Sequence, residues 1–303
     1  GYDSCGIATI VKSKLTRFRS VSRVEFLEQS INTADPLPGT IGIAHTRWAT
    51  HGAPEIKNTH PHFSQDTLAI VHNGIIENYK DLKSSLIEKG YKFESDTDTE
   101  VVVHLIHSFY EGDLFSAFRK AVPLLKGAFA IAVMSKNEPE KLVAAKKGAP
   151  LVLGIGEKEN FVASDPLALS GVTDKFVYFE DWDMAEITQD HYQIYSFDGE
   201  SYKSVQRAVI SIETKIHNLC LGDYSHYMEK EIYEQPKAVR DTIESLAGFA
   251  PQAFGFKAPE YFKKLKRVLV LACGTSFYAG MVAKYWLEKI AKVPCDIEIA
   301  SEY

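Results

Sequence analysis

Short apolar runs bounded by turn residues dominate the first two thirds of this 303-residue chain. Their length and their Gly, Asn and Asp boundaries are typical of β-strands rather than helices. We predict strands at residues 5–12, 42–47, 67–72, 127–135, 141–147, 151–156, 175–180 and 191–197. The dipeptide Asp198-Gly199 after the last run is a hairpin signal.

Two helical patterns interrupt these strands. Residues 78–89 carry apolar side chains at helical spacing and end at Gly90. A second helix is predicted to begin at Thr97, because Thr97 and Glu100 have the spacing of a capping box. Strands and helices in this order predict a layered α+β or α/β domain.

The pattern changes towards the end of the chain. A helical pattern covers residues 237–246, and "KRVLVLACGTSFYAGMVAKYWLEKI" then predicts a buried strand, a tight turn and an amphipathic helix. "CDIEIAS" predicts a second strand, which completes a βαβ unit of a parallel sheet. We therefore divide the chain into a first domain (1–222), a linker (223–230) and the beginning of a second domain (231–303), because a parallel sheet needs more strands than these residues supply.

Composition excludes several classes of function. The net charge is −6 and no Lys/Arg-rich block is present, which disfavours nucleic acid as a partner. We find no apolar run long enough to span a bilayer and no signal-peptide pattern. Four cysteines in a chain of this length do not make a disulfide framework, so the expected compartment is a reducing cytoplasm.

The densest chemistry lies in "HTRWATHGAPEIKNTHPH" and "VHNGIIEN". The first segment places Arg47, Trp48, Thr50 and His51 at the end of a strand and in the loop that follows. A guanidinium can hold a carboxylate through two parallel hydrogen bonds, and the alternative is a structural ion pair.

Two further positions have a functional and a structural interpretation. The amide of Asn73 and the N–H of Gly74 could form an oxyanion hole, but Asn-Gly is also a common turn. Asp98 lies in the first turn of a helix, where the dipole stabilises an acid, and it could instead receive a substrate ammonium.

Five histidines cluster in the same stretch: His45, His51, His60, His62 and His72. Their spacing includes no H-x-x-x-H on a helix and no paired cysteine motif, so we do not expect a metal site.

The segment "LACGTSFYAG" places Cys273, Gly274, Thr275 and Ser276 between a strand and a helix. Backbone N–H groups and hydroxyls at a helix N-terminus favour phosphate, and the alternative is simple capping without a ligand. The apolar strand before Cys273 predicts a buried, inert thiol there.

Taken together, these motifs resemble the glutamine–fructose-6-phosphate aminotransferase (glucosamine-6-phosphate synthase) family. The resemblance covers essentially all 303 residues and is carried by "GYDS-x-GIA", "HTRWATHG", "HPH", "VHNGIIEN", "SDTDTEV", "NFVASDPLAL", "HYMEKEIYEQP" and "LACGTSFYAGMVAKYW". It implies an N-terminal-nucleophile glutaminase domain, an αββα sandwich, followed by the start of an α/β sugar-isomerase (SIS) domain.

The resemblance also implies roles for single residues. Arg47 matches the arginine that holds the glutamine α-carboxylate, with Thr50 and His51 in the same loop, and Trp48 matches the indole that gates an ammonia channel. Asn73 and Gly74 match the oxyanion hole, and Asp98 matches the acid that binds the α-ammonium. Residues 273–276 match the segment near the sugar phosphate, with Thr275 and Ser276 as the best phosphate contacts.

The implied reaction transfers the amide nitrogen of glutamine to fructose 6-phosphate, the first step of amino-sugar synthesis. It needs no metal or organic cofactor, and its partners are these two small molecules and a second copy in a homodimer. In the family the nucleophilic cysteine is the mature N-terminus and lies upstream of "GYDS", so we expect it to be absent here and the chain alone to be inactive. Trimming to expose Cys5 is the alternative for the thiol.

Two other functions remain open at this point. One is a different class II amidotransferase, such as an amidophosphoribosyltransferase, and the other is a non-catalytic sugar-phosphate binding module.

Overall fold

We examined a computed structural model of the chain, which describes residues 3–33, 39–49, 52–197, 199, 201–212, 221, 223–246 and 257–303. The chain forms two compact units, Gly1–Leu219 and Cys220–Tyr303, which we call unit 1 and unit 2. Within the described residues, no helix is both long enough and apolar enough to cross a membrane.

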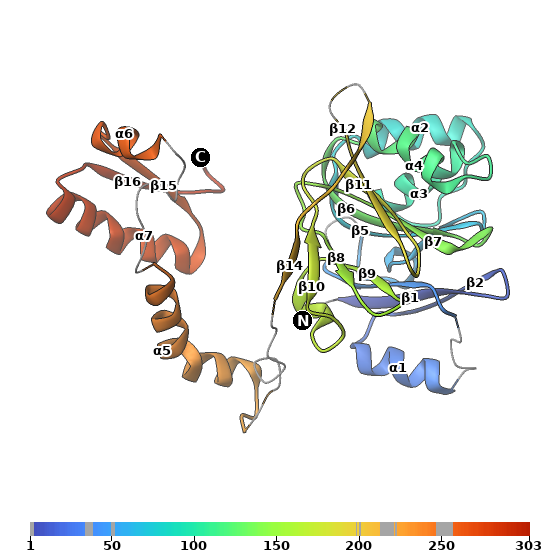
Figure 1. The fold of residues 1–303 in the computed structure, drawn as a ribbon, viewed down its shortest axis with the longest axis horizontal. Coiled ribbons are helices and arrows are strands. Elements are labelled where there is room, and N and C mark those ends of the chain that lie inside the picture. The colour runs from blue at the N-terminus through green and yellow to red at the C-terminus, as the bar shows by residue number, and fades with distance from the viewer. Residues whose placement is uncertain are drawn as a thin grey trace. The chain divides into compact units, whose positions relative to one another are not determined.

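A seven-stranded antiparallel sheet forms the centre of unit 1 (Figure 1), in the order β13-β12-β11-β7-β6-β5-β4. Its strands are β4 (His62–Ser64), β5 (Leu68–Ile76), β6 (Gly127–Ser135), β7 (Glu138–Lys147), β11 (Asp183–Ile187), β12 (Tyr192–Phe197) and β13 (Tyr202–Val205). Helices α2 (Tyr79–Glu88), α3 (Asp98–Ser108) and α4 (Leu114–Ala121) cover one face.

The opposite face packs against two smaller sheets. One has the order β2-β1-β3, built from β1 (Ser4–Val11), β2 (Lys14–Ser20) and β3 (Gly42–Arg47). The other has the order β14-β10-β8-β9, built from β8 (Val152–Ile155), β9 (Asn160–Ala163), β10 (Lys175–Tyr178) and β14 (Val209–Ser211). Helix α1 (Val24–Thr33) packs on β1 and β2, so the layers follow the order helix, sheet, sheet, helix.

Strand β6 shows how the sequence produces two cores. Successive side chains of a strand point to opposite faces. Phe129, Ile131 and Val133 therefore pack towards the helices, whereas Ala130 and Ala132 pack towards the smaller sheets. Because both faces are buried, this strand appears in the sequence as a continuous apolar run rather than as an alternation.

All eight predicted strands are present, with ends that differ by zero to four residues. The helix predicted at residues 78–89 is α2, and the helix predicted from Thr97 is α3, where the Thr97 hydroxyl accepts the Glu100 N–H at 3.3 Å. The hairpin signal is confirmed by the antiparallel pairing of β12 with β13. In unit 1, prediction from sequence missed several strands and two helices, namely β2, β4, β9, β11, β13, β14, α1 and α4.

Unit 2 contains the predicted βαβ unit. Strands β15 (Val268–Ala272) and β16 (Cys295–Ile299) pair in parallel, and α7 (Gly274–Trp286) connects them. Before them come α5 (Tyr227–Leu246) and the short α6 (Ala258–Lys263), and a π-helical turn (Leu287–Ala291) continues α7. Helix α5 begins inside the segment expected to be a linker and contains Pro236.

Two expectations for this unit were wrong. Leu269 and Leu271 are 42% and 44% exposed, so β15 is not buried on both faces, because a single helix covers one face of a two-stranded sheet. Cys273 is exposed rather than buried, because it lies beyond the end of the strand, as the N-cap residue of α7.

Candidate active site

A cavity of about 320 Å³ in unit 1 brings the main sequence candidates together, and we call it the clamp pocket. It is lined by His45, Thr46, Arg47, Trp48, His60, His72, Asn73, Gly74, Ile75, Thr97, Asp98 and Thr99. Five of the seven residues predicted for the amidotransferase site are among them, and Thr50 and His51 lie outside the described residues.

Arg47 is the last residue of β3 and supplies the positive charge of the pocket. It is 4% exposed, and its Nη1 and Nη2 donate to the backbone oxygens of Ala53 (3.3 Å) and Gly52 (2.9 Å). Burial lowers the pKa of Arg47, although the charges of Asp3 and Asp98 oppose this. An arginine stays protonated in proteins, so a buried cation faces the cavity.

Asp98 supplies the negative charge. It is the first residue of α3, is 3% exposed, and one carboxylate oxygen accepts the Ile76 N–H at 2.8 Å. Within the described part of the chain, its second oxygen makes no hydrogen bond. The helix N-terminus stabilises the charged carboxylate.

Asn73 lies in the middle of β5 and is oriented by a histidine. The His45 Nε2 is 2.8 Å from the Asn73 Oδ1, which assigns the proton of a neutral imidazole to Nε2. The Asn73 Nδ2 has no acceptor among the described residues, and Asn73 lines the pocket. Sequence reasoning missed this role of His45, because nothing in the spacing shows that β3 and β5 bring the two residues together.

Gly74 is part of the strand and not of a turn. Asn73 and Gly74 pair with Ala130 and Phe129 of β6, so the Asn-Gly turn is excluded, and the strand does not end at this dipeptide as expected. Gly74 has φ +119°, and a Cβ atom there would lie 2.1 Å from the Ala128 oxygen. Only glycine fits this position.

Three histidines, His45, His60 and His72, line the pocket and contact one another or a shared threonine. The His72 N–H donates to His60 Nδ1 (3.4 Å), so His60 carries its proton on Nε2 and donates to Thr99 Oγ1 (3.2 Å). The Thr99 hydroxyl then donates to His72 Nδ1 (3.0 Å). His60 stacks on His45 with ring centroids 4.2 Å apart. Within the described residues, no group of three His, Cys, Asp or Glu side chains could hold a metal ion.

Asp3 is a second residue that sequence reasoning missed. Its carboxylate accepts the Ala49 N–H, and its own N–H donates to the Arg47 oxygen at 2.9 Å. It therefore fixes the backbone on both sides of Trp48, which is 69% exposed at the rim of the pocket. The "GYDS" motif contains Asp3, but the sequence offers no sign that it contacts this loop.

The described thiols lie elsewhere. Cys5 is 3% exposed in β1 and its Sγ donates to the Ser22 oxygen at 3.5 Å. Burial, and then the charge of Glu25, raise the pKa of the Cys5 thiol. Cys5 lines a neighbouring cavity of about 700 Å³ between the sheets, whose lining is mainly apolar. Neither Cys5, Cys273 nor Cys295 lines the clamp pocket, so the geometry does not support Cys5 as a nucleophile.

The second group of sequence candidates lies in unit 2. Cys273 is the N-cap residue of α7, and Gly274, Thr275 and Ser276 form its exposed first turn. Within the described part of unit 2, the Cys273 side chain makes no capping hydrogen bond to this turn.

Comparison with known proteins places these features in a family. Residues 45–171 match a glutamine amidotransferase domain. The curated glutamine–fructose-6-phosphate aminotransferase [isomerizing] of Bordetella pertussis is 48% identical over 308 residues, and that of Pseudomonas syringae pv. tomato is 50% identical over 309 residues. Each alignment covers 100% of this chain and 50% of the relative, so the chain spans about half their length.

Solved structures agree on the fold. An allosteric regulatory enzyme of purine biosynthesis matches 68% of this chain and 43% of its own, with a TM-score of 0.55 and 27% identity. A glutamine phosphoribosylpyrophosphate amidotransferase from B. subtilis matches 98% of this chain and 60% of its own, with the same TM-score and 20% identity. These likenesses show a class II glutamine amidotransferase fold. The much higher identity over the whole chain shows that this protein is similar along its full length to about half the length of the glutamine–fructose-6-phosphate aminotransferases.

Proposed function

We propose that the clamp pocket binds L-glutamine and that the protein transfers its amide nitrogen to fructose 6-phosphate. The observation that carries the proposal is the pairing of Arg47 and Asp98 in one small cavity. An α-amino acid presents a carboxylate and an ammonium on one carbon, so it needs one cationic and one anionic partner. Both partners are buried here, which strengthens their interactions with a ligand that displaces water.

Asn73 and Gly74, which also line the pocket, are proposed to stabilise the transition state of amide cleavage. When a nucleophile attacks the side-chain amide of glutamine, negative charge develops on the amide oxygen. The Asn73 Nδ2 and the Gly74 N–H are the donors proposed to stabilise this charge. His45 occupies the Asn73 oxygen, which leaves the Asn73 nitrogen as the donor available to a ligand. The proposal assigns binding and oxyanion stabilisation to these residues and the attack to none of the described thiols.

For unit 2 we propose the beginning of a SIS domain that binds the phosphate of fructose 6-phosphate at the start of α7. Support comes from the parallel βαβ arrangement and from the exposed Thr275 and Ser276. Accordingly, residues 1–222 are the proposed amidotransferase domain and residues 231–303 the start of the sugar domain. We also propose that the protein is a homodimer located in the cytoplasm. Light scattering of the purified protein tests whether it is a dimer.

Glutamine binding is the direct test of the site. We expect the chain to bind L-glutamine in calorimetry or ligand-observed NMR, and Asp98→Asn to weaken binding by about 10- to 100-fold, since a charged hydrogen bond contributes about 1.5–3 kcal/mol. The asparagine keeps an acceptor for the Ile76 N–H, so the change removes the charge and little else.

Asp113→Asn is the matched control. Asp113 is also an acid at a helix N-terminus, where it accepts the Phe115 and Ser116 N–H groups, but it does not line the pocket. Equal affinity of the wild type and the Asp98 variant would contradict the proposal. A matching loss in the Asp113 variant would show a general effect of removing a negative charge from a helix N-terminus.

A further inference from the structure

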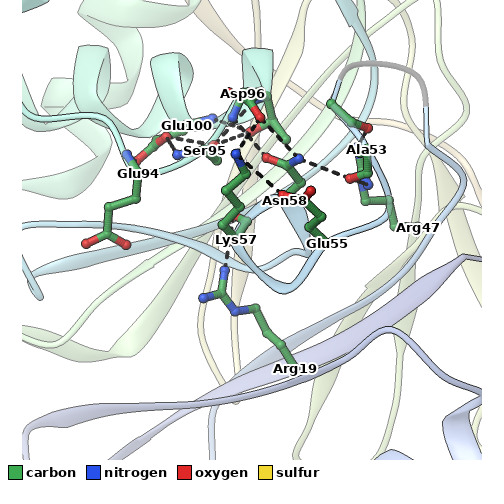
Figure 2. Close-up of polar contacts among 12 residues, drawn as sticks. Arg19, Arg47, Ala53, Glu55, Lys57, Asn58, Glu94, Ser95, Asp96 and Glu100 are labelled. Carbon is green, nitrogen blue, oxygen red and sulfur yellow. Dashed lines mark hydrogen bonds and ion pairs between the residues drawn. The ribbon is translucent and has the colours of Figure 1, made fainter.

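The side-chain amide of Asn58 connects two segments beside the clamp pocket (Figure 2). We call them arms: one carries Arg47 and the other carries Asp98. Asn58 ends the short 3-10 helix Ile56–Asn58 and is 0% exposed. Its Nδ2 donates to the Ala53 oxygen at 3.0 Å, and its Oδ1 accepts the Asp96 N–H at 2.9 Å. The Nδ2 also lies 3.5 Å from an Asp96 carboxylate oxygen.

One end of this bridge holds the arm that carries Arg47. The Ala53 oxygen that accepts from Asn58 also accepts from Arg47 Nη1, and the adjacent Gly52 oxygen accepts from Nη2. Gly52 has φ +82°, and a Cβ atom there would lie 2.6 Å from the Asn58 Nδ2. The carbonyls that fix the guanidinium are thus packed directly against the Asn58 amide.

The other end holds the arm that carries Asp98. Asp96 is two residues before Asp98, and the turn between them leads into α3. The same turn is fixed on the helix by Glu100, which accepts the Glu94 N–H (2.9 Å) and the Ser95 N–H (2.7 Å). On the surface, Lys57 adds an ion pair to Asp96 at 2.9 Å.

We propose that Asn58 is a positioning residue that sets the separation of Arg47 and Asp98, so that the pocket selects ligands with a carboxylate and an ammonium on one carbon. This inference rests on the proposed glutamine site. Asn58 does not line the pocket, so its effect is through the two residues that do.

An amide is the group that the position requires. It donates and accepts at once, whereas an aspartate would place a carboxylate against the Ala53 oxygen and the Asp96 carboxylate. An alanine would leave the Asp96 N–H without its acceptor. Either change frees the two arms to move relative to each other while leaving Arg47 and Asp98 themselves intact.

The experiment compares L-glutamine with two ligands that use one arm each. Glutaramic acid lacks the ammonium, and 4-aminobutanamide lacks the α-carboxylate. In Asn58→Ala and Asn58→Asp of the full chain, we expect the Kd for L-glutamine to rise about tenfold or more, which corresponds to about 1.4 kcal/mol. The Kd of each one-armed ligand should change by less than about twofold, because neither needs the correct separation.

Asn160→Ala is the matched control, because the Asn160 amide also joins two segments, through the Thr188 (2.9 Å) and Gln189 (3.2 Å) oxygens, without lining the clamp pocket. Amide NMR spectra establish that each variant is folded, and the isosteric Asp variant carries the comparison if the Ala variant unfolds. Unchanged L-glutamine binding, or an equal loss for all three ligands, would overturn the role of Asn58. Failure of the wild type to bind L-glutamine would instead overturn the proposed function, and this inference with it.

Discussion

Mild acid should destabilise unit 1, because His60 and His62 are buried and their pKa values are lowered in the folded state. His62 is 3% exposed, and burial lowers its pKa to about 3. The nearby Arg19, Arg17 and Arg47 lower it further, while Glu100 opposes them. Burial also lowers the pKa of His60 well below its usual value, assisted by the neighbouring histidines.

The direction of the stability change with pH follows from the number of protons that the folded and unfolded chains bind. Between the folded pKa of about 3 and the unfolded value of 6.5, the unfolded chain binds a proton at His62 that the folded chain does not, so stability falls as the pH falls. At about pH 5.5 the loss from His62 alone is about 1.4 kcal/mol, and His60 raises the total to as much as about 3 kcal/mol. A typical domain has only about 5–15 kcal/mol of stability, so the effect is readily measured.

Glu100 acts in a lower pH window. Burial raises the pKa of this carboxyl, but hydrogen bonds from His104, Glu94 and Ser95 outweigh burial and bring the pKa to about 2. A depressed carboxylate pKa gives stability that is complete above the unfolded value of 4.5 and is lost as the pH falls towards the folded pKa. Destabilisation that already appears at about pH 5.5 therefore reports on histidine.

Urea denaturation at about pH 7.5 and about pH 5.5 measures how much the free energy of unfolding of unit 1 falls in mild acid. A Trp286→Phe background removes the tryptophan of unit 2, so that Trp48 and Trp182 report on unit 1. His62→Gln should reduce the loss by about 1.4 kcal/mol, and the exposed His191→Gln should leave it unchanged. Stability that is equal or higher at the acidic pH, or an identical loss in the His62 variant, would refute the reasoning.

Two further substitutions test which contacts stabilise unit 1, measured by urea denaturation. Arg207→Ala should cost about 3–5 kcal/mol, because the fully buried Asp183 loses hydrogen bonds of 2.9 and 2.8 Å from one guanidinium. Gly74→Ala should cost about 2 kcal/mol or more, since its Cβ would collide with the Ala128 oxygen. Gly90→Ala is its control, because Gly90 also has a positive φ (+89°) but nothing lies within 4 Å of an added Cβ.

Elements with strong apolar or capping signals could be predicted from the sequence. The central strands were found because both of their faces are buried, and α3 was found because Thr97 caps it. Strand β2 was missed because it is an edge strand of its sheet with the sequence KLTRFRS, which has little apolar content. Most missed strands are short ones whose stability comes from pairing with neighbours, which no local pattern reveals.

The residues that line the site could be predicted from the sequence, but the residues that hold them in place could not. Arg47, Asn73, Gly74 and Asp98 belong to motifs that the resemblance identifies, and the fold places them in one cavity. His45 and Asn58 act across 28 and 38 positions of the chain, on Asn73 and Asp96 respectively. A single sequence carries no local signal for such contacts, because they exist only after the sheets and turns have assembled.

The position of Asn73 and Gly74 inside β5 has a consequence for altering the ligand that the pocket accepts. Both residues pair with β6, whereas β4 pairs with β5 only at residues 68–70, so the proposed reacting end of the pocket is built on a strand of the central sheet. The recognition end depends instead on turns around residues 52–58 and 94–98. Redesign towards other amino acids should therefore vary these turns and keep β5 fixed, so that a new side-chain amide still meets the same oxyanion donors.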